Sequence, residues 1–176
     1  MTAIERIKPF AEDKGDIHIV IDTPRGSRNK LKWDKKLGLL KLSHILTAGA
    51  VFPFDFGFVP GTHGPDGDAV DVLVLSDEPL FPLCLVQARL IGVIEAEQTQ
   101  EGKTFRNDRM VAVAVGSRLY AKVNELDDLP PTLMDEIEQF FINYNTMRGR
   151  VFKPMARAGA AEGMKLVKRS TAKSQS

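Results

Sequence analysis

A run of proline, glycine and phenylalanine near the middle of the chain constrains the fold most strongly. Residues 51–65 read VFPFDFGFVPGTHGP, and their three prolines and three glycines exclude a regular helix. Alternate side chains of an extended chain point the same way, so the phenylalanines at every second position from Phe52 to Phe58 would face one side. We expect this row to anchor the segment to a hydrophobic core.

Short strands separated by turns account for most of the remaining chain. Apolar, often β-branched runs end at glycine, proline or aspartate after a few residues, which is typical of an all-β barrel or sandwich. The turn at Thr23–Ser27 follows the first strand, and Leu31–Asp34 could pair back as a hairpin. The expected strands are Ile17–Ile21, Leu31–Asp34, Leu39–Leu46, Val70–Leu75, Leu83–Ile94 and Met110–Val115.

One long helix is predicted in the C-terminal half. Pro130 and Pro131 precede an apolar pattern of helical spacing, and Gly149 is a suitable stop. The pattern consists of Leu133, Ile137, Phe140, Phe141 and Tyr144. We therefore predict a mainly β fold with flanking helices, in a single domain over residues 1–176. Residues 1–15 are expected as a short helical or irregular lead-in, and residues 165–176 as a mobile basic tail.

Composition and charge exclude several classes of protein. The 176 residues carry a net charge of +1, so no overall field favours nucleic acid or an anionic membrane. Glu5 and Asp13 interrupt any apolar N-terminal stretch and no run of about 18 apolar residues exists, so we expect no signal peptide, no membrane span and a cytoplasmic location. The single cysteine, Cys84, cannot form an internal disulfide and is expected in the core as a small hydrophobic side chain.

The densest group of ionisable residues is DGDAVD at residues 66–71, directly before the apolar run VLVL. Asp66 and Asp68 lie two residues apart, so an extended backbone aims both the same way, and Asp71 enters the strand. Clustered carboxylates repel one another unless cations neutralise them, and their hard oxygens suit Mg²⁺, Mn²⁺ or Ca²⁺. A solvated acidic turn is the alternative. An EF-hand loop is excluded, because Asp71 stands at the glycine position.

The segment PFDFGFVPGTHGPDGDAVDVLVLSDEPLFP resembles the signature region of family I soluble inorganic pyrophosphatases. That family carries a Pro-x-Asn-Tyr-Gly-like segment, then Asp-x-Asp-x-x-Asp and a Val-Leu-Val strand. The resemblance runs in order from about residue 17 to 153, through Val20–Pro24, Asn29–Asp34, Pro82–Ile94 and the helix around Phe140–Tyr144. It implies a five-stranded barrel of OB type with flanking helices, and a homo-oligomer, commonly a hexamer.

For the acidic residues, the resemblance implies metal binding and proton transfer. Asp66 and Asp71 would hold Mg²⁺, with Mn²⁺ as a substitute, and Asp68 would take a proton from the attacking water. The catalytic residue implied by the resemblance is therefore Asp68.

Further metal ligands are expected in a long loop between residues 95 and 108. Counting back from MVAV at 110–113, Asn107 falls on the ligand position and Asp108 lies one residue on. One step along a strand points a side chain to the other face, so Asp108 could serve as a metal ligand only if the backbone shifts or bulges. A glutamate of the 95–101 stretch is the alternative ligand.

The other wall of the implied site would bind phosphate. Lys30 and Tyr144 match phosphate-binding positions, Arg109 stands in place of a lysine, and His44 in place of a phosphate-binding arginine. All four are candidate substrate-binding residues. Further departures from the family pattern are Asp22 for a glutamate, Lys32 for an acidic residue, Asp55 for an asparagine, Phe56 for a tyrosine and Asn145 for a lysine.

These residues support three hypotheses about function. The first is Mg²⁺-dependent hydrolysis of inorganic pyrophosphate, or of a related phosphoanhydride, by a metal-activated water. The second is a catalytically weak or silent protein of the same fold that binds metal or phosphate ligands. A nucleic-acid-binding OB module is the third, and the near-neutral charge argues against it.

Overall fold

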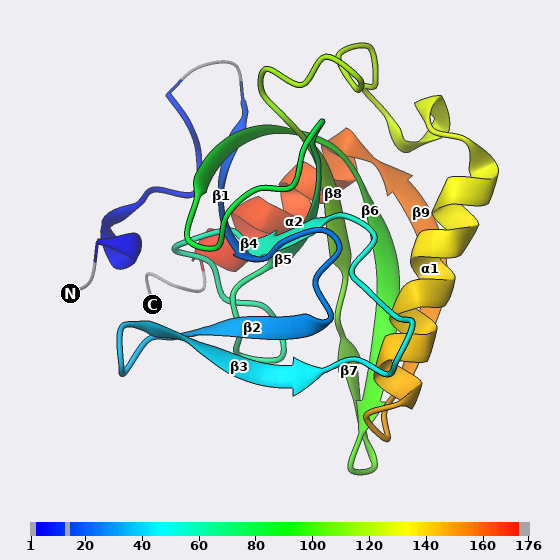
Figure 1. The fold of residues 1–176 in the computed structure, drawn as a ribbon. Helices are drawn as coiled ribbons and strands as arrows, with labels where there is room; N and C mark the ends of the chain where they lie inside the picture. The colour runs from blue at the N-terminus through cyan, green and yellow to red at the C-terminus, as the bar shows by residue number, and fades with distance from the viewer. Residues whose placement is uncertain (1–2, 13–14, 173–176) are drawn as a thin grey trace.

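Five strands close into a barrel in the computed structural model, which describes residues 3–12 and 15–172 (Figure 1). Adjacent strands around the ring pair with each other, and the last pairs with the first. All these pairs are antiparallel except β5–β8, which is parallel. The expected five-stranded barrel of OB type is confirmed. In ring order the strands are β1 (Ile17–Thr23), β4 (Asp55–Phe58), β5 (Asp71–Leu75), β8 (Arg109–Ala114) and β6 (Leu85–Gln100).

The long strand β6 extends beyond the barrel as the centre of a further sheet. Its second half pairs with β7 (Lys103–Arg106) and with β9 (Val151–Gly159). Glu101 and Gly102, between β6 and β7, have φ angles of 51° and 73°, and two positive angles are typical of a two-residue hairpin turn. The stretch from residue 95 to 108 was expected as a loop, and this prediction was wrong because its strands continue the sheet.

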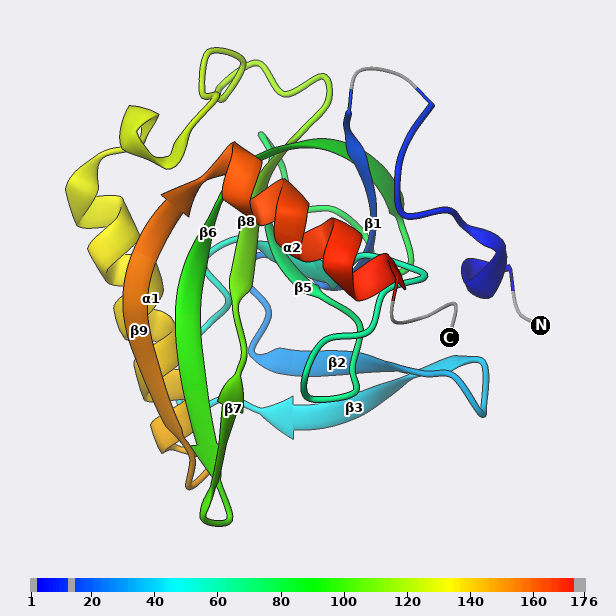
Figure 2. The ribbon, with the colours of Figure 1, turned by 180° about the vertical axis from the view of Figure 1, so that it is seen from behind.

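A second, two-stranded sheet lies beside the barrel (Figures 1 and 2). It consists of β2 (Asn29–Asp34) and β3 (Leu39–Ile45), with Trp33 opposite Leu40. The hairpin partner of β2 is therefore β3, and the suggested pairing back onto the preceding strand was wrong. A side chain makes that link instead, because the Leu31 N–H donates to Thr23 Oγ1 at 3.0 Å.

The predicted long helix is α1 (Pro131–Thr146), which packs against β9. Pro131 occupies its first position, where a missing N–H breaks no helical hydrogen bond. Ile137 and Phe141 are buried, as the helical spacing predicted. The turn after the helix contains Gly149 at a φ of 70°, a conformation that glycine adopts without strain.

The C-terminal stretch forms a second helix, α2 (Ala160–Ala172), on the face of the barrel that is turned toward the viewer in Figure 2. Val167 on this helix is 0% exposed and packs in a core cluster with strands β1 and β5. Residues 165–172 were expected in a mobile tail, and the structure corrects this. The reason is that a few apolar side chains among the basic ones suffice to dock the helix. Residues 173–176 lie outside the described residues.

Two hydrophobic clusters result from the alternation of side chains along the strands. On β5, Leu73 and Leu75 join the cluster under α1, whereas Val72 and Val74 join the cluster under α2. The phenylalanine row from Phe52 to Phe58 is buried throughout, as expected. The segment is thereby fixed at the edge of the cavity described below.

Smaller features complete the fold. A 3-10 turn at Ile4–Arg6 agrees with the expected lead-in, and another spans Leu126–Asp128. Cys84 is partly exposed and packs against the edge of a core cluster, so the core position expected for it was wrong. Within the described residues, the helices are too short or too polar to cross a membrane.

Candidate functional site

One cavity of about 580 Å³ opens between the barrel, the β2–β3 hairpin and the C-terminal end of α1. Its lining is strongly charged, with seven lysine and arginine side chains against five aspartate and glutamate side chains. The basic residues are Lys30, Lys32, Lys35, Lys103, Arg109, Arg148 and Arg150, and the acidic ones are Asp22, Asp66, Asp68, Asp71 and Glu101. A cavity of this kind suits a small anion together with a cation.

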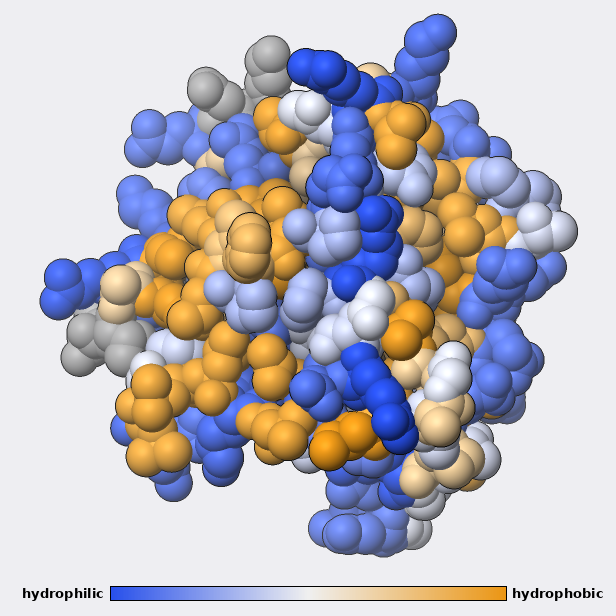
Figure 3. Space-filling view, in the orientation of Figure 1, coloured by the Kyte–Doolittle hydropathy of each residue, from blue (hydrophilic) through white to orange (hydrophobic). Residues whose placement is uncertain are grey.

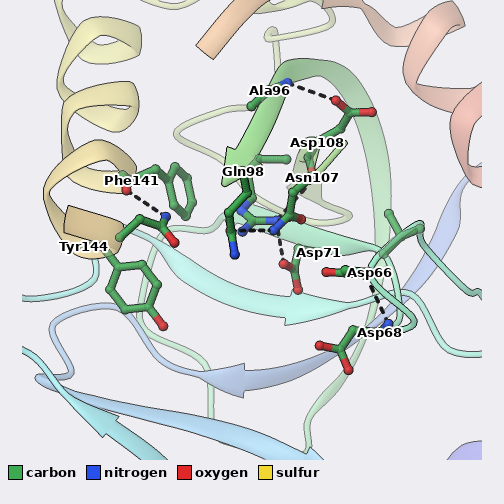
Figure 4. A network of polar contacts seen from close by, with 12 residues as sticks. Asp66, Asp68, Asp71, Ala96, Gln98, Asn107, Asp108, Phe141 and Tyr144 are labelled. Atoms are coloured by element: carbon green, nitrogen blue, oxygen red, sulfur yellow. Dashed lines mark hydrogen bonds and ion pairs between the residues drawn. The ribbon is translucent and has the colours of Figure 1, made fainter. Parts of the chain in front are cut away.

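The DGDAVD motif forms a tight turn that leads into β5. Gly64 donates its N–H to the Asp68 carbonyl at 2.7 Å, and the Asp68 N–H donates to Asp66 Oδ1 at 3.0 Å. Gly67 has a φ of 82°, which favours glycine. Figure 4 shows Asp66, Asp68 and Asp71 on one side of the opening. Burial, and then the nearby carboxylates, raise the pKa of Asp66.

Arg109 is the cation closest to this motif. Its Nη1 lies 2.6 Å from Asp71 Oδ2, because the parallel register of β5 and β8 pairs Val72 with Met110 and so sets the preceding residues side by side. The guanidinium is buried against the rings of Phe141 and Phe152, 5.3 and 5.5 Å from their centroids. The predicted substrate-binding arginine is therefore rigidly held beside a predicted metal ligand.

Lys30 and Asp22 form a second, deeper ion pair. Lys30 Nζ lies 2.6 Å from Asp22 Oδ1 and 4.2 Å from the centroid of Phe56. Burial raises the pKa of Asp22 to about 6, and the Lys30 ammonium opposes this shift. Burial likewise lowers the pKa of Lys30. The structure thus places Lys30, for which the resemblance implied phosphate binding, as a buried side chain in the cavity lining.

Lys32 makes a contact that sequence reasoning missed. Its Nζ lies 2.7 Å from Asp68 Oδ2, and both side chains are 53% exposed. The two residues are 36 positions apart, and no local pattern signals the pairing. The only sequence signal was the presence of a lysine at a position where the family has an acidic residue.

Tyr144 and His44 lie close together but differ in access to the cavity. Tyr144 lines it and accepts a hydrogen bond from Arg148 Nη1 at 2.8 Å, and burial raises the pKa of its hydroxyl. His44 packs edge-on against the Tyr144 ring and is not among the cavity-lining residues. Burial, and then the charges of Arg148 and Arg150, lower the pKa of His44. The structure therefore brings Tyr144 into the site but not His44.

Asp108 points away from the cavity, as the alternation of the strand predicted. Its Oδ1 accepts hydrogen bonds from the Ala96 N–H at 3.0 Å and from Arg106 at 2.8 Å. Figure 4 shows it directed at the Ala96 backbone, apart from Asp66 and Asp71. It lines a neighbouring cavity under α2 together with Glu95, and Asp66 and Asp71 border that cavity as well. The bulge that would have made it a ligand does not occur at this residue.

Two amides lie close to Asp71, because Arg109 Nη1 contacts both Asp71 and Asn107. Asn107 Nδ2 donates to Gln98 Oε1 at 2.8 Å, and Arg109 donates to Asn107 Oδ1. Gln98 was missed by sequence reasoning, because it lies in the stretch expected as a loop. A third amide, Asn145, is turned inward and donates to the Phe141 carbonyl at 2.9 Å.

The donor set fits one divalent cation better than several. Among residues 3–12 and 15–172, three or more His, Cys, Asp or Glu side chains do not gather into a metal site. Mg²⁺, however, commonly binds one or two carboxylates and completes its shell with water and phosphate oxygens. Asp66 and Asp71 supply such a pair of carboxylates. The residues present therefore fit one Mg²⁺ at this wall.

Known proteins of similar sequence and structure agree with one another. The family model for inorganic pyrophosphatase matches residues 19–175. An inorganic pyrophosphatase of Nostoc sp. is 37% identical over 81% of this chain and 82% of its own length. The soluble inorganic pyrophosphatase 2 of Chlamydomonas reinhardtii is 37% identical over 88% of this chain and 78% of its own.

The solved structures that match nearly the whole chain are inorganic pyrophosphatases as well. The inorganic pyrophosphatase of Thermus thermophilus superposes with a TM-score of 0.90 at 28% identity, covering 99% of this chain and all of that one. That of Neisseria gonorrhoeae gives 0.89 at 30% identity, with the same coverage. The chain therefore belongs to the inorganic pyrophosphatase family of enzymes.

Proposed function

We propose that this chain hydrolyses inorganic pyrophosphate to two phosphates, in a Mg²⁺-dependent reaction at the charged cavity. The proposal rests above all on the placement of Asp66, Asp68 and Asp71 on one wall, with the buried cations Lys30 and Arg109 beside them. Hard carboxylate oxygens and fixed cations together suit a metal complex of a compact polyanion.

The cationic residues would bind and orient the two phosphate groups. Lys30 and Arg109 are held by ion pairs and aromatic rings, so they need little reorganisation when charge develops on the phosphate oxygens. Tyr144 would donate its hydroxyl proton to a phosphate oxygen, while Arg148 donates to the same hydroxyl and strengthens that donor.

The acidic residues would provide the metal site and the base. Mg²⁺ held by Asp66 and Asp71, with Mn²⁺ as a substitute, would supply a water of lowered pKa and neutralise phosphate charge. Asp68 would accept the proton of the attacking water. Lys32 contacts only Oδ2 of that carboxylate, so Oδ1 is the oxygen that we assign to the proton.

A larger phosphoanhydride is the second candidate substrate. Arg148 and Arg150 add positive charge to the lining beyond Tyr144, where further phosphoryl groups could extend. A catalytically silent protein is the other alternative, and the ion pairs of Asp68 and Asp71 with protein cations favour it.

We also propose a cytoplasmic homo-oligomer, with the hexamer suggested by family resemblance, and no nucleic-acid or membrane partner. The net charge of +1 and a relative named as a soluble enzyme support the location and the absence of these partners. Exposed apolar side chains, including Phe81 and Leu119, support the assembly.

Phosphate release from purified protein tests the proposed function. We expect fast release from pyrophosphate with Mg²⁺, loss on chelation with EDTA, and recovery when Mg²⁺ is restored. Tripolyphosphate and a nucleoside triphosphate, assayed in parallel, test the larger substrates. No release from any of the three would reject hydrolysis and leave the silent protein.

A further inference from the structure

Two carboxylates of the cavity already face cations that belong to the protein. Arg109 lies 2.6 Å from Asp71, and Lys32 lies 2.7 Å from Asp68. Arg109 is only 5% exposed and packs between aromatic rings, so it cannot withdraw from the wall without losing these contacts. Protein charge, fixed at the buried Arg109 and solvent-exposed at Lys32, thus stands where the clustered aspartates would otherwise need metal ions to neutralise them.

Beside Asp71, the cavity offers neutral amides whose oxygens are in use. Gln98 Oε1 accepts a hydrogen bond from Asn107, and Asn107 Oδ1 accepts one from Arg109. An amide has a single oxygen that can bind a metal, and it carries no charge to offset that of the ion. The nearby Asp108 carboxylate is engaged on the other face of the strand.

The net charge of the whole cavity lining also disfavours the binding of additional cations. Its basic side chains outnumber the acidic ones by two, so the cavity is already net positive when all these groups are ionised. Each further divalent cation would enter this positive lining, where Asp22 and Asp68 are already paired with lysines, which is unfavourable. A pyrophosphate anion, in contrast, would be attracted to this lining.

We propose that Lys32, Arg109 and the Gln98–Asn107 amide pair take the place of additional divalent cations, so that the cavity binds a single divalent ion, at Asp66 and Asp71. The inference rests on the proposed function and deepens it, because it specifies how the charge of the substrate is balanced. Arg109 joins the amide pair to Asp71, since its Nη1 contacts Asp71 and Asn107 at once. Replacing the amides with carboxylates should therefore create a further cation site.

Calorimetric titration with Mn²⁺ tests this, without substrate and with imidodiphosphate, a pyrophosphate analogue whose bridging oxygen is replaced by NH. For the full-length protein we expect one Mn²⁺ per chain in both titrations. The double variant Gln98→Glu, Asn107→Asp keeps the side-chain shapes and should gain a second Mn²⁺, or bind Mn²⁺ at least about tenfold more tightly. Gln100→Glu is the matched control for the single variants Gln98→Glu and Asn107→Asp, because each adds one negative charge to the lining of the same cavity.

Several outcomes of the titrations would overturn the inference. Two or more Mn²⁺ ions per wild-type chain would show that the fixed cations do not replace metals. An unchanged double variant, or a gain in Gln100→Glu equal to that of the single variants, would remove the role of the amide pair. The titration needs no turnover, so a protein that binds one Mn²⁺ but hydrolyses nothing would reject the proposed function alone. A protein that hydrolyses pyrophosphate with two bound ions would reject this inference alone.

Discussion

Single residues at the floor of the cavity combine burial with charge, and Asp22 shows the consequence most clearly. Its carboxylate is 4% exposed and contacts the Lys30 ammonium at 2.6 Å. Burial outweighs that attraction and raises the pKa to about 6 from an unfolded value of 3.8. The folded protein therefore binds this proton more tightly than the unfolded chain does, and protonation of Asp22 stabilises the fold.

The pH dependence of stability follows from this sign. The stabilisation by the Asp22 proton is fully present below about pH 4 and is lost as the pH rises through about 6. Relative to Asp22→Asn, which imitates the protonated state, the wild type should lose on the order of 3 kcal/mol across that window. Urea unfolding of both proteins at several pH values measures the difference. If the difference in free energy of unfolding between the two proteins stayed constant from pH 4 to 7, the pKa of Asp22 would not be raised.

The candidate residues themselves were partly predictable from sequence. The acidic turn depends on local spacing, so Asp66, Asp68 and Asp71 were found together. The contact of Arg109 with Asp71 depends on the pairing of β5 with β8, and that of Lys32 with Asp68 on how the β2–β3 hairpin meets the acidic turn, and spacing encodes neither. His44 was misplaced for the same reason, since its position beside the Tyr144 ring depends on how β3 meets α1.

Among the elements, α1 and most of the buried strands were predictable because their periodicity is strong, whereas β4, β7, β9 and α2 were missed. Pro154 lies within β9 and argues against a strand, but it sits where the register with β6 shifts, between Glu95 and Ala96. The sequence of α2 is basic, and only a few apolar side chains reveal its buried face. Elements stabilised mainly by tertiary contacts thus escaped prediction.

The docking of α2 gives a prediction for one side chain. Val167 is fully buried, so Val167→Ala should lower the free energy of unfolding by about 1–2 kcal/mol. Lys168→Ala, at the exposed neighbouring position, should change it by less than about 0.5 kcal/mol. Chemical denaturation measures both. Equal stability of the two variants would mean that α2 is not docked in solution.

At the scale of the whole molecule, several large apolar side chains are exposed on the surface outside the cavity. Figure 3 shows hydrophobic groups spread over one face. Phe81 is 82% exposed and Leu119 is 72% exposed. Asp77, shortly before Phe81 in the chain, accepts a hydrogen bond from the Leu119 N–H and so holds the loops of Phe81 and Leu119 near each other. Such surfaces are typical of subunit interfaces.

The assembly is therefore expected to contain several copies of the chain. Light scattering during size-exclusion chromatography should give a multiple of the chain mass, and six copies would agree with the family resemblance. Phe81→Asp should reduce the mass if this face is the interface, whereas Lys122→Asp, at an exposed polar position, should not. A monomer at all concentrations would contradict the proposed assembly.

The central claim is that the acidic turn of this barrel hydrolyses pyrophosphate with Asp68 as the base. The most direct measurement is kcat for phosphate release from Mg²⁺-pyrophosphate, compared between the wild type, Asp68→Asn and the exposed control Asp127→Asn. We predict a loss of about 10²–10⁴-fold in Asp68→Asn only, since a positioned base contributes that much. Equal rates in wild type and Asp68→Asn would contradict the account.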